Sequence, residues 1–385
     1  MSGRLRIAAA VLTLGVAGCA VLLGIEDRAV VEGTVVPAEA GIDRCAHTQP
    51  PAAPDVDDDP DTQAQYVVAA RGIDIAPSAN GVLGFDLDGT CTCDPTPSAH
   101  DAGPSCTSTV SRNCDQEGGT GIDNAFAQLT YVKALSGTVF GAGSAADGNC
   151  GRSALLAVIG KYNGRANDKD VTFAFVLSSG LQTPHEAGEV PSSCNNVGGP
   201  QPTVYVPRGD GTDQWSTDTS FVVSKTLHPS QLLNGYVRDW VLVARASEGV
   251  PIRVPFGPFI GDARAAIVRA SLAIADGGVQ IIDGELAARL TSSSVIQGIA
   301  SVPLGGKAGY ICPNNANAAL FKSAVDSICS GRDILSDPVQ DFTGVACDSV
   351  SSAVRFSGDP AQMLEPEAPV DAGVSDCPGV DASCE

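Results

Sequence analysis

Residues 170–178 read DVTFAFVLS, and this stretch indicates the kind of fold that the chain adopts. Val171, Phe173 and Phe175 alternate with smaller residues, so the bulky apolar side chains fall on one face of an extended chain. Such alternation is typical of an antiparallel strand with one face against the core. The turn-forming pair Asn163-Gly164 lies shortly before it. The stretch therefore predicts a strand that follows a tight turn.

Further segments on both sides combine β-forming residues with bounding turns. They are 65–75, 81–87, 153–162, 202–206, 219–226, 236–246, 250–256, 266–275 and 278–282. Helical spacing of apolar residues is found at 122–137, 284–299 and 314–330, without the strand–helix alternation of a doubly wound sheet. We therefore expect a mainly β fold with a few helices (α+β), an antiparallel β-sandwich or open barrel stapled by disulfides.

Composition divides the 385 residues into one large domain with acidic flanks. Residues 19–65 carry a run of proline and aspartate, which predicts an extended tether. We expect the β-rich globular domain at 66–356, with a cysteine-rich loop at 88–121. Residues 357–385 are acidic and rich in proline and glycine, which predicts a flexible tail.

The N-terminus has the pattern of an export signal. Two arginines precede the apolar run 7–16, which is too short to span a bilayer but normal for a signal peptide. Val16-Ala17-Gly18-Cys19 then resembles the lipobox of bacterial lipoproteins. The resemblance implies that residues 1–18 are removed and that Cys19 is lipidated, which anchors the protein in the bacterial cell envelope, at the outer membrane or cell surface. An ordinary secretory signal cut at the same small residues is the alternative.

The cysteine count agrees with an exported protein. The chain has thirteen cysteines, and a lipidated Cys19 leaves an even number for disulfides. These disulfide candidates are Cys45, Cys91, Cys93, Cys106, Cys114, Cys150, Cys194, Cys312, Cys329, Cys347, Cys377 and Cys384. We expect one or two pairs within 91–114, Cys312 paired with Cys329 or Cys347, and Cys377 paired with Cys384. Zinc bound by the 91–114 cysteines is the alternative, although Cys-x-Cys is not the usual knuckle spacing.

The charge of the chain excludes some partners. It carries 44 acidic and 23 basic residues, a net charge of −21. A protein that binds nucleic acid must neutralise phosphates, so we expect no nucleic-acid partner. Electrostatic adhesion to anionic lipid is excluded on the same ground, which leaves the N-terminal lipid as the membrane attachment.

One acidic turn has part of the pattern of a calcium loop. Asp86-Leu87-Asp88-Gly89-Thr90 places alternate carboxylates before a glycine, and we expect Asp86 and Asp88 to ligate calcium. The pattern departs from an EF-hand, because Pro95 stands where that loop needs a glutamate. A plain acidic turn is the alternative. The fold could bring further acidic turns to this site: Asp115-Gln116-Glu117, Asp123, Asp147, Asp168-Lys169-Asp170, Asp210, Asp213 and Asp283-Glu285.

The sequence offers a binding residue but no catalytic one. Trp215 lies in a polar segment, so we expect it to be partly exposed and able to contact a glycan, whereas Trp240 reads as a core residue. The familiar motifs of serine hydrolases, zinc proteases, P-loop proteins and dinucleotide-binding proteins are absent from the sequence, and we assign no catalytic residue.

A second resemblance is looser. The segment 84–93 (GFDLDGTCTC), the turn after Tyr162, and Asp337-Pro338 with the later Cys347-Asp348 look like predicted lipoproteins of myxobacteria. That group implies no role for any residue. We expect a membrane-anchored exported lipoprotein with a structural or binding role toward a protein partner or glycan, and with no cofactor other than calcium. An exported hydrolase with an unrecognised carboxylate site is the alternative.

Overall fold

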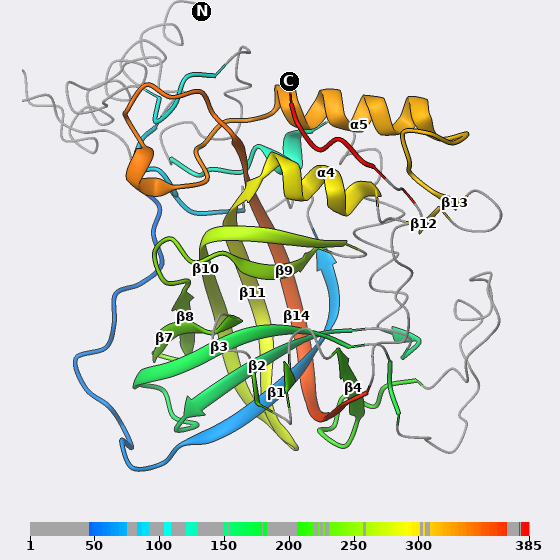
Figure 1. The fold of residues 1–385 in the computed structure, drawn as a ribbon. Helices are drawn as coiled ribbons and strands as arrows, with labels where there is room; N and C mark the ends of the chain where they lie inside the picture. The colour runs from blue at the N-terminus through cyan, green and yellow to red at the C-terminus, as the bar shows by residue number, and fades with distance from the viewer. Residues whose placement is uncertain are drawn as a thin grey trace, which may run out of the picture. The chain divides into compact units, whose positions relative to one another are not determined.

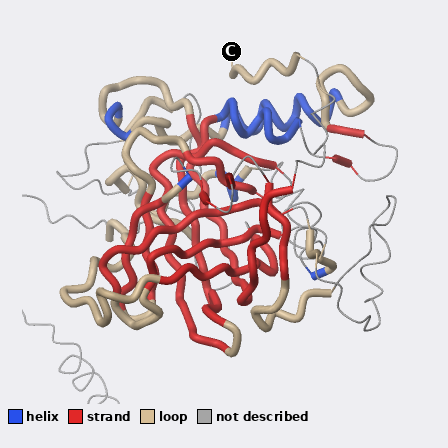
Figure 2. Tube along the Cα trace, turned by 60° about the horizontal axis from the view of Figure 1, so that its bottom comes forward, coloured by secondary structure: helices blue, strands red, loops and turns tan. Residues whose placement is uncertain are grey.

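A computed structural model gives the arrangement of the strands and helices. It describes residues 46–74, 83–91, 104–108, 121–129, 149–151, 154–178, 180–182, 206–218, 222–223, 226–227, 231–256, 259–300, 303–304, 309–367, 377 and 379–384. These residues all belong to one compact unit, which begins at Asp43. Strands are the commonest secondary structure, at 45% of the residues, and the longer helices lie at the edge of the strands (Figure 2).

Eight antiparallel strands of the described chain close into a barrel (Figure 1). In order around the barrel they are β1 (Ala64–Asp74), β2 (Ala154–Tyr162), β3 (Asp168–Ser178), β7 (Leu233–Arg238), β8 (Val241–Arg245), β10 (Phe259–Ala275), β11 (Gly278–Thr291) and β14 (Ser349–Glu367). β14 pairs with β11 on one side and with β1 on the other, which closes the sheet. The predicted mainly β, antiparallel fold is confirmed, and its form is a closed barrel.

Shorter elements extend the barrel. β4 (Gln214–Asp218) runs parallel to the end of β14, and β9 (Ile252–Phe256) pairs with the start of β10. Two small ribbons join β5 (Val222–Val223) to β6 (Thr226–Leu227) and β12 (Pro303–Leu304) to β13 (Gly309–Tyr310). The helical elements are η2 (Phe126–Gln128), α4 (Ser292–Ala300), α5 (Ala318–Ser330) and η7 (Pro338–Gln340). None of the helices in the described part of the chain is long and apolar enough to cross a membrane.

The inside of the barrel is filled by apolar side chains. Phe175 contacts both Phe173 and Phe356 edge to face, and all three are buried. The buried faces of α4 and α5, which lie beyond one end of the strands in Figure 1, belong to the same apolar cluster. Eight strands make a barrel narrow enough for side chains to fill. A ligand site is therefore to be sought on the outer surface of the barrel or at its rim.

Three predicted elements differ from the structure. The segment 284–299 is helical only from Ser292. Leu286 and Leu290 are an even number of residues apart, so they also suit a strand, and both point from β11 into the apolar core of the barrel. The segment 236–246 is a hairpin, because Asp239 and Trp240 adopt positive φ and turn the chain between β7 and β8. Residues 83–87 form no strand.

The two remaining predicted helices differ in how far they are present. The helix at 314–330 is present as α5, but of the helix expected at 122–137 the described residues contain only η2. Residues 202–205 and 219–221 lie outside the described residues, as do residues 1–45 with the predicted signal peptide and the predicted lipidation site Cys19.

The acidic segment before β1 lies against the barrel. The Asn163 side-chain amide donates to Asp57 Oδ1 at 3.0 Å, and the Asn167 amide N–H donates to Asp58 Oδ2 at 2.8 Å. Tyr236 donates its hydroxyl to the Pro51 carbonyl. Because aspartates accept these bonds from the turn between β2 and β3, residues 46–63 are part of the folded unit, whereas a tether was expected as far as 65.

The end of the chain also differs from the expected tail. β14 continues past residue 356 to Glu367, paired with β1 and β4. Beyond it, Cys377 bonds to Cys312 and Cys384 bonds to Cys329 on α5. The two disulfides hold the last described residues against the helical layer, so these residues are not a free tail.

The disulfide pairing that we expected is wrong wherever the structure describes it. Besides the two C-terminal pairs, Cys106 bonds to Cys347 across 241 residues of sequence. Cys91 and Cys150 are also disulfide-bonded. The pairs that the structure describes join cysteines 55, 65 and 241 residues apart in sequence, so the fold and not the spacing decides them. Cys45, Cys93, Cys114 and Cys194 lie outside the described residues.

Candidate functional site

The segment 83–91 crosses the outer face of the barrel. Leu83 and Phe85 pack on Ile267, Ala287 and Ala353, which point outward from β10, β11 and β14. Gly84 has a φ of +131°, and a Cβ there would come within 2.8 Å of Ile122, so the close approach of this segment to residues 122–123 requires glycine. This packing fixes the turn that follows, which carries Asp86 and Asp88.

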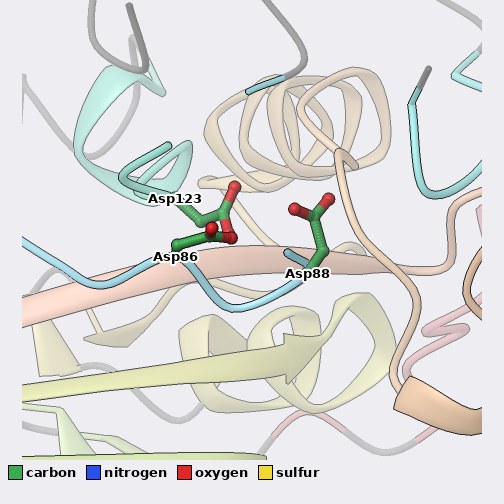
Figure 3. Close-up of side chains that lie close together, drawn as sticks. All are labelled: Asp86, Asp88 and Asp123. Atoms are coloured by element: carbon green, nitrogen blue, oxygen red, sulfur yellow. The ribbon is translucent and has the colours of Figure 1, made fainter. Parts of the chain in front are cut away.

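Three buried carboxylates meet at this turn. Asp86 and Asp88 are joined by Asp123, and the exposed fractions are 3%, 7% and 2%. One carboxylate oxygen from each lies within 4.8 Å of the other two. Figure 3 shows the Asp86 and Asp123 carboxylates close together and the Asp88 carboxylate on the same side of the segment. We call these three residues the acidic cluster.

Backbone donors orient each carboxylate of the acidic cluster. The Gly89 N–H donates to Asp86 Oδ1 and the Leu87 N–H donates to Asp123 Oδ2, both at 2.6 Å. The Thr90 N–H donates to Asp88 Oδ1 at 3.1 Å. The backbone N–H groups of the turn residues Leu87–Thr90 thus hold the three carboxylates in place, so the site is organised before any ligand binds.

His47 and Arg289 are basic residues of the described chain that lie near the acidic cluster. His47 Nδ1 lies 2.6 Å from Asp86 Oδ2, at the partly exposed edge of the cluster. Arg289 is buried and acts on Asp88 electrostatically, but its guanidinium binds both oxygens of Asp341, at 2.9 and 2.7 Å. Much of its charge is therefore compensated outside the cluster.

Burial raises the pKa of Asp88 to about 6. Loss of hydration is the main cause, and the negative charge of Asp86 adds to it. The Ser105 hydroxyl, the Thr90 N–H and the charge of Arg289 act in the opposite direction. The loss of hydration thus destabilises the ionised Asp88 carboxylate more than these groups stabilise it. A cation bound here would stabilise the ionised form.

Ser105 is a further polar group at this place. It is fully buried, and its Oγ makes no hydrogen bond of good geometry to a described residue, yet it lies near enough to Asp88 to lower the pKa of that carboxyl. An oxygen in this position is a candidate fourth ligand. It stands beside Cys106, whose disulfide to Cys347 fixes the local backbone.

The donor set suits a hard cation. Calcium takes six to eight oxygen ligands at about 2.3–2.6 Å, so two ligands on opposite sides of the ion lie about 4.6–5.2 Å apart. Carboxylate oxygens within 4.8 Å of one another fit this spacing. The zinc alternative is wrong for Cys91 and Cys106, because both are disulfide-bonded.

Sequence reasoning named two of the three carboxylates. Asp123 was only one of several acidic turns, and it does not cap a helix, since η2 begins after Ala125. Ser105 and His47 carried no signal. The other described acidic turns, at 168–170, 210, 213 and 283–285, join no cluster of this kind among the residues that the structure describes.

Trp215 is buried rather than partly exposed. Its exposed fraction is 1%, because β4 lies against the outer face of the barrel, where the indole packs with Leu156, Val176 and Leu181. It nevertheless lines a cavity. Trp240, expected in the core, lies at the tip of the β7–β8 hairpin and is 37% exposed.

No family model, curated protein or solved structure matches this chain. Its function must therefore be argued from its own residues.

Proposed function

We propose that this protein is an exported envelope protein with a lipid anchor at Cys19, that its role is structural or binding, and that one calcium ion stabilises its barrel. The acidic cluster carries the calcium proposal: Asp86, Asp88 and Asp123 are buried and share one small volume. Three carboxylates buried this close together repel one another, and a cation bound among them would offset both that repulsion and the loss of hydration. Calcium is the hard cation abundant outside the cell.

The calcium proposal predicts a stability change that depends on Asp88. At a free calcium concentration about 100 times Kd, binding to the folded state alone stabilises it by about 2.7 kcal/mol. We expect the melting temperature of the mature protein to rise with calcium over EDTA, and Asp88→Asn to remove most of that rise. Calorimetric titration and thermal melting measure both effects.

Asp326→Asn is the matched control, because Asp326 is an exposed aspartate on α5 that pairs with the exposed Lys322. It should leave the calcium response unchanged. A wild-type protein that shows neither binding heat nor a change in melting temperature at millimolar calcium would refute the proposal.

The lipid anchor has a separate test. The lipobox Val16-Ala17-Gly18-Cys19 supports attachment through Cys19, and several acyl chains give the stable anchoring that one chain cannot. In the native host, Cys19→Ser should abolish incorporation of labelled palmitate, while Cys45→Ser should retain it. Labelling that survives in the Cys19→Ser protein contradicts the anchor.

The hydrolase alternative gains no support from the acidic cluster. A glycosidase places two carboxyl groups about 5–10 Å apart on either side of a substrate. Here the oxygens lie within 4.8 Å of one another and the side chains are at most 7% exposed, so no substrate fits between them.

A further inference from the structure

The chain between α5 and β14 exposes three large apolar side chains. Val339 is 81% exposed, Phe342 48% and Val345 47%. This part of the chain leads directly into β14, whose first residue, Ser349, pairs with the last residue of β11, next to the start of α4. It therefore lies at the end of the barrel that carries α4 and α5 (Figure 1). We call residues 339–346 the apolar loop.

The exposed residues of the apolar loop carry no charge. They are Val339, Gln340 and the run 342–346. The one charged residue of the loop, Asp341, has a side chain that is only 9% exposed, and both of its oxygens bind the Arg289 guanidinium. Exposed apolar side chains that are grouped, rather than scattered singly, mark interaction sites. In a chain of net charge −21, this group stands out because its acidic member is neutralised inside the protein.

The backbone of the apolar loop is held in place while its side chains stay outside. The Phe342 N–H donates to the Ser105 carbonyl at 2.7 Å, and the Val345 carbonyl accepts from the Thr107 N–H at 2.8 Å. Phe342 adopts a φ of +65°, which is rare and costly for a bulky residue. Its ring is half exposed, so burial in the core does not offset this cost. A contact outside the barrel would give the exposed ring a role.

The apolar loop lies close to the start of the described chain. Arg289, which binds Asp341 of the loop, also donates to the Leu87 carbonyl. The neighbouring Asp86 N–H donates to the Thr48 carbonyl at 2.9 Å. Through these contacts the apolar loop, the segment 83–91 and the first described residues meet at one end of the barrel.

A lipid at Cys19 would keep this end of the barrel within reach of the membrane. Residues 20–45 separate Cys19 from the described chain, and that length spans at most about 90 Å when fully extended. Attachment to the same surface raises the effective concentration of a second contact, so a contact too weak to recruit a free protein becomes populated.

We propose that the apolar loop inserts into the membrane that holds the lipid anchor. Val339, Phe342 and Val345 enter the boundary between headgroups and acyl chains, and the uncharged loop meets no repulsion from anionic lipid. A protein partner is less favoured, because a stable protein interface uses about 20–30 residues on each side. The inference rests on the lipid anchor proposed above and goes beyond it, since insertion decides which end of the barrel faces the membrane.

The test uses the mature lipidated protein in phosphatidylcholine vesicles. Phe342→Trp places an indole on the apolar loop. Ile274→Trp is the matched control, because Ile274 is 56% exposed beside the β10–β11 turn, at the other end of the barrel. Insertion reaches about 5–10 Å into the headgroup–acyl boundary, so brominated lipid should lower the emission added by Phe342→Trp on the order of twofold or more. The emission added by Ile274→Trp should not change.

Two further measurements separate insertion from other causes. Replacing part of the phosphatidylcholine with anionic phosphatidylglycerol should not increase the quenching, because the exposed residues of the loop carry no charge. Phe342→Asn removes the ring, and asparagine adopts positive φ more readily than phenylalanine. The melting temperature of the Phe342→Asn protein should therefore not fall below that of the wild type.

Four results would overturn the inference: equal quenching of the two tryptophan variants, quenching that needs anionic lipid, a lower melting temperature for Phe342→Asn, and self-association of the wild type in solution that Phe342→Asn abolishes. The third would make the ring a packing residue, and the fourth would assign the loop to a second copy of the chain. If palmitate still labels Cys19 in these cases, the loop inference alone fails. Loss of that labelling would remove the anchor and count against the proposed function as well.

Discussion

Replacing Arg289 with methionine is expected to lower the free energy of unfolding by about 3–5 kcal/mol. Arg289 points outward from β11 and is fully buried. It binds Asp341 with two hydrogen bonds, the Leu335 carbonyl at 3.0 Å, and the Leu87 carbonyl. Without it, Asp341 keeps a buried charge with no cation, and two carbonyls lose their donor. The loops 83–91 and 335–341, which Arg289 joins to β11, would then be held less firmly.

Urea unfolding of the Arg289→Met protein measures this change. Lys322→Met is the control, because it also removes an ion pair with an aspartate. Lys322 and Asp326 are exposed on α5, so we expect the free energy of unfolding to fall by no more than about 0.5 kcal/mol. Arg289→Lys should fall near the methionine variant, because lysine cannot form the two-pronged contact with Asp341. A loss below 1 kcal/mol for Arg289→Met would contradict this role.

Arg289 also shows where prediction from sequence stops. Inside β11 it alternates with Ala288 and Leu290, so its position reads as a solvent-facing one. The alternation correctly gives the face of the barrel on which Arg289 lies. It cannot show that loops from residues 83–91 and 335–341 cover that face, because neither loop is near Arg289 in sequence.

The acidic cluster was predictable only in part, for the same reason. Asp86 and Asp88 lie two residues apart with a glycine after them, and spacing of this kind carries a signal. Asp123 reaches the site through the backbone of Phe85, which accepts from its N–H at 3.1 Å. A pairing of two non-strand segments leaves no periodicity in the sequence.

The strands were the most predictable part, and the tryptophans were the least. The alternation of bulky apolar and smaller residues over 170–178 predicted β3 correctly, because one face of β3 packs directly in the core. Trp215 was misjudged from its polar neighbours, since β4 is buried by parallel pairing with β14, far along the chain. The cysteine pairs failed likewise, because closure of the barrel decides which loops meet.

The calcium-free protein is expected to lose stability as the pH rises from about 4 to about 6. The folded pKa of Asp88 is about 6, against a usual 3.8. Below pH 3.8 the group is protonated in both states, so its contribution is fully present. As the pH rises above 3.8, Asp88 ionises first in the unfolded chain, which stabilises the unfolded state and lowers the free energy of unfolding. The decrease ends near pH 6, where Asp88 ionises in the folded protein as well. The difference between the two pKa values corresponds to about 3 kcal/mol.

Asp88→Asn isolates this contribution, because asparagine still offers an oxygen to the Thr90 N–H but does not titrate. In EDTA, the free energy of unfolding of the variant relative to wild type should rise by about 3 kcal/mol from pH 4 to pH 7. Calcium should oppose the loss only where Asp88 is ionised, so its stabilising effect on the wild type should grow through pH 6. A difference between variant and wild type that stays flat with pH would mean that Asp88 is ionised throughout, and that burial does not raise its pKa. A calcium effect that is as large at pH 4 as at pH 7 would instead place the ion elsewhere, since a protonated carboxyl in the cluster cannot serve as a full ligand.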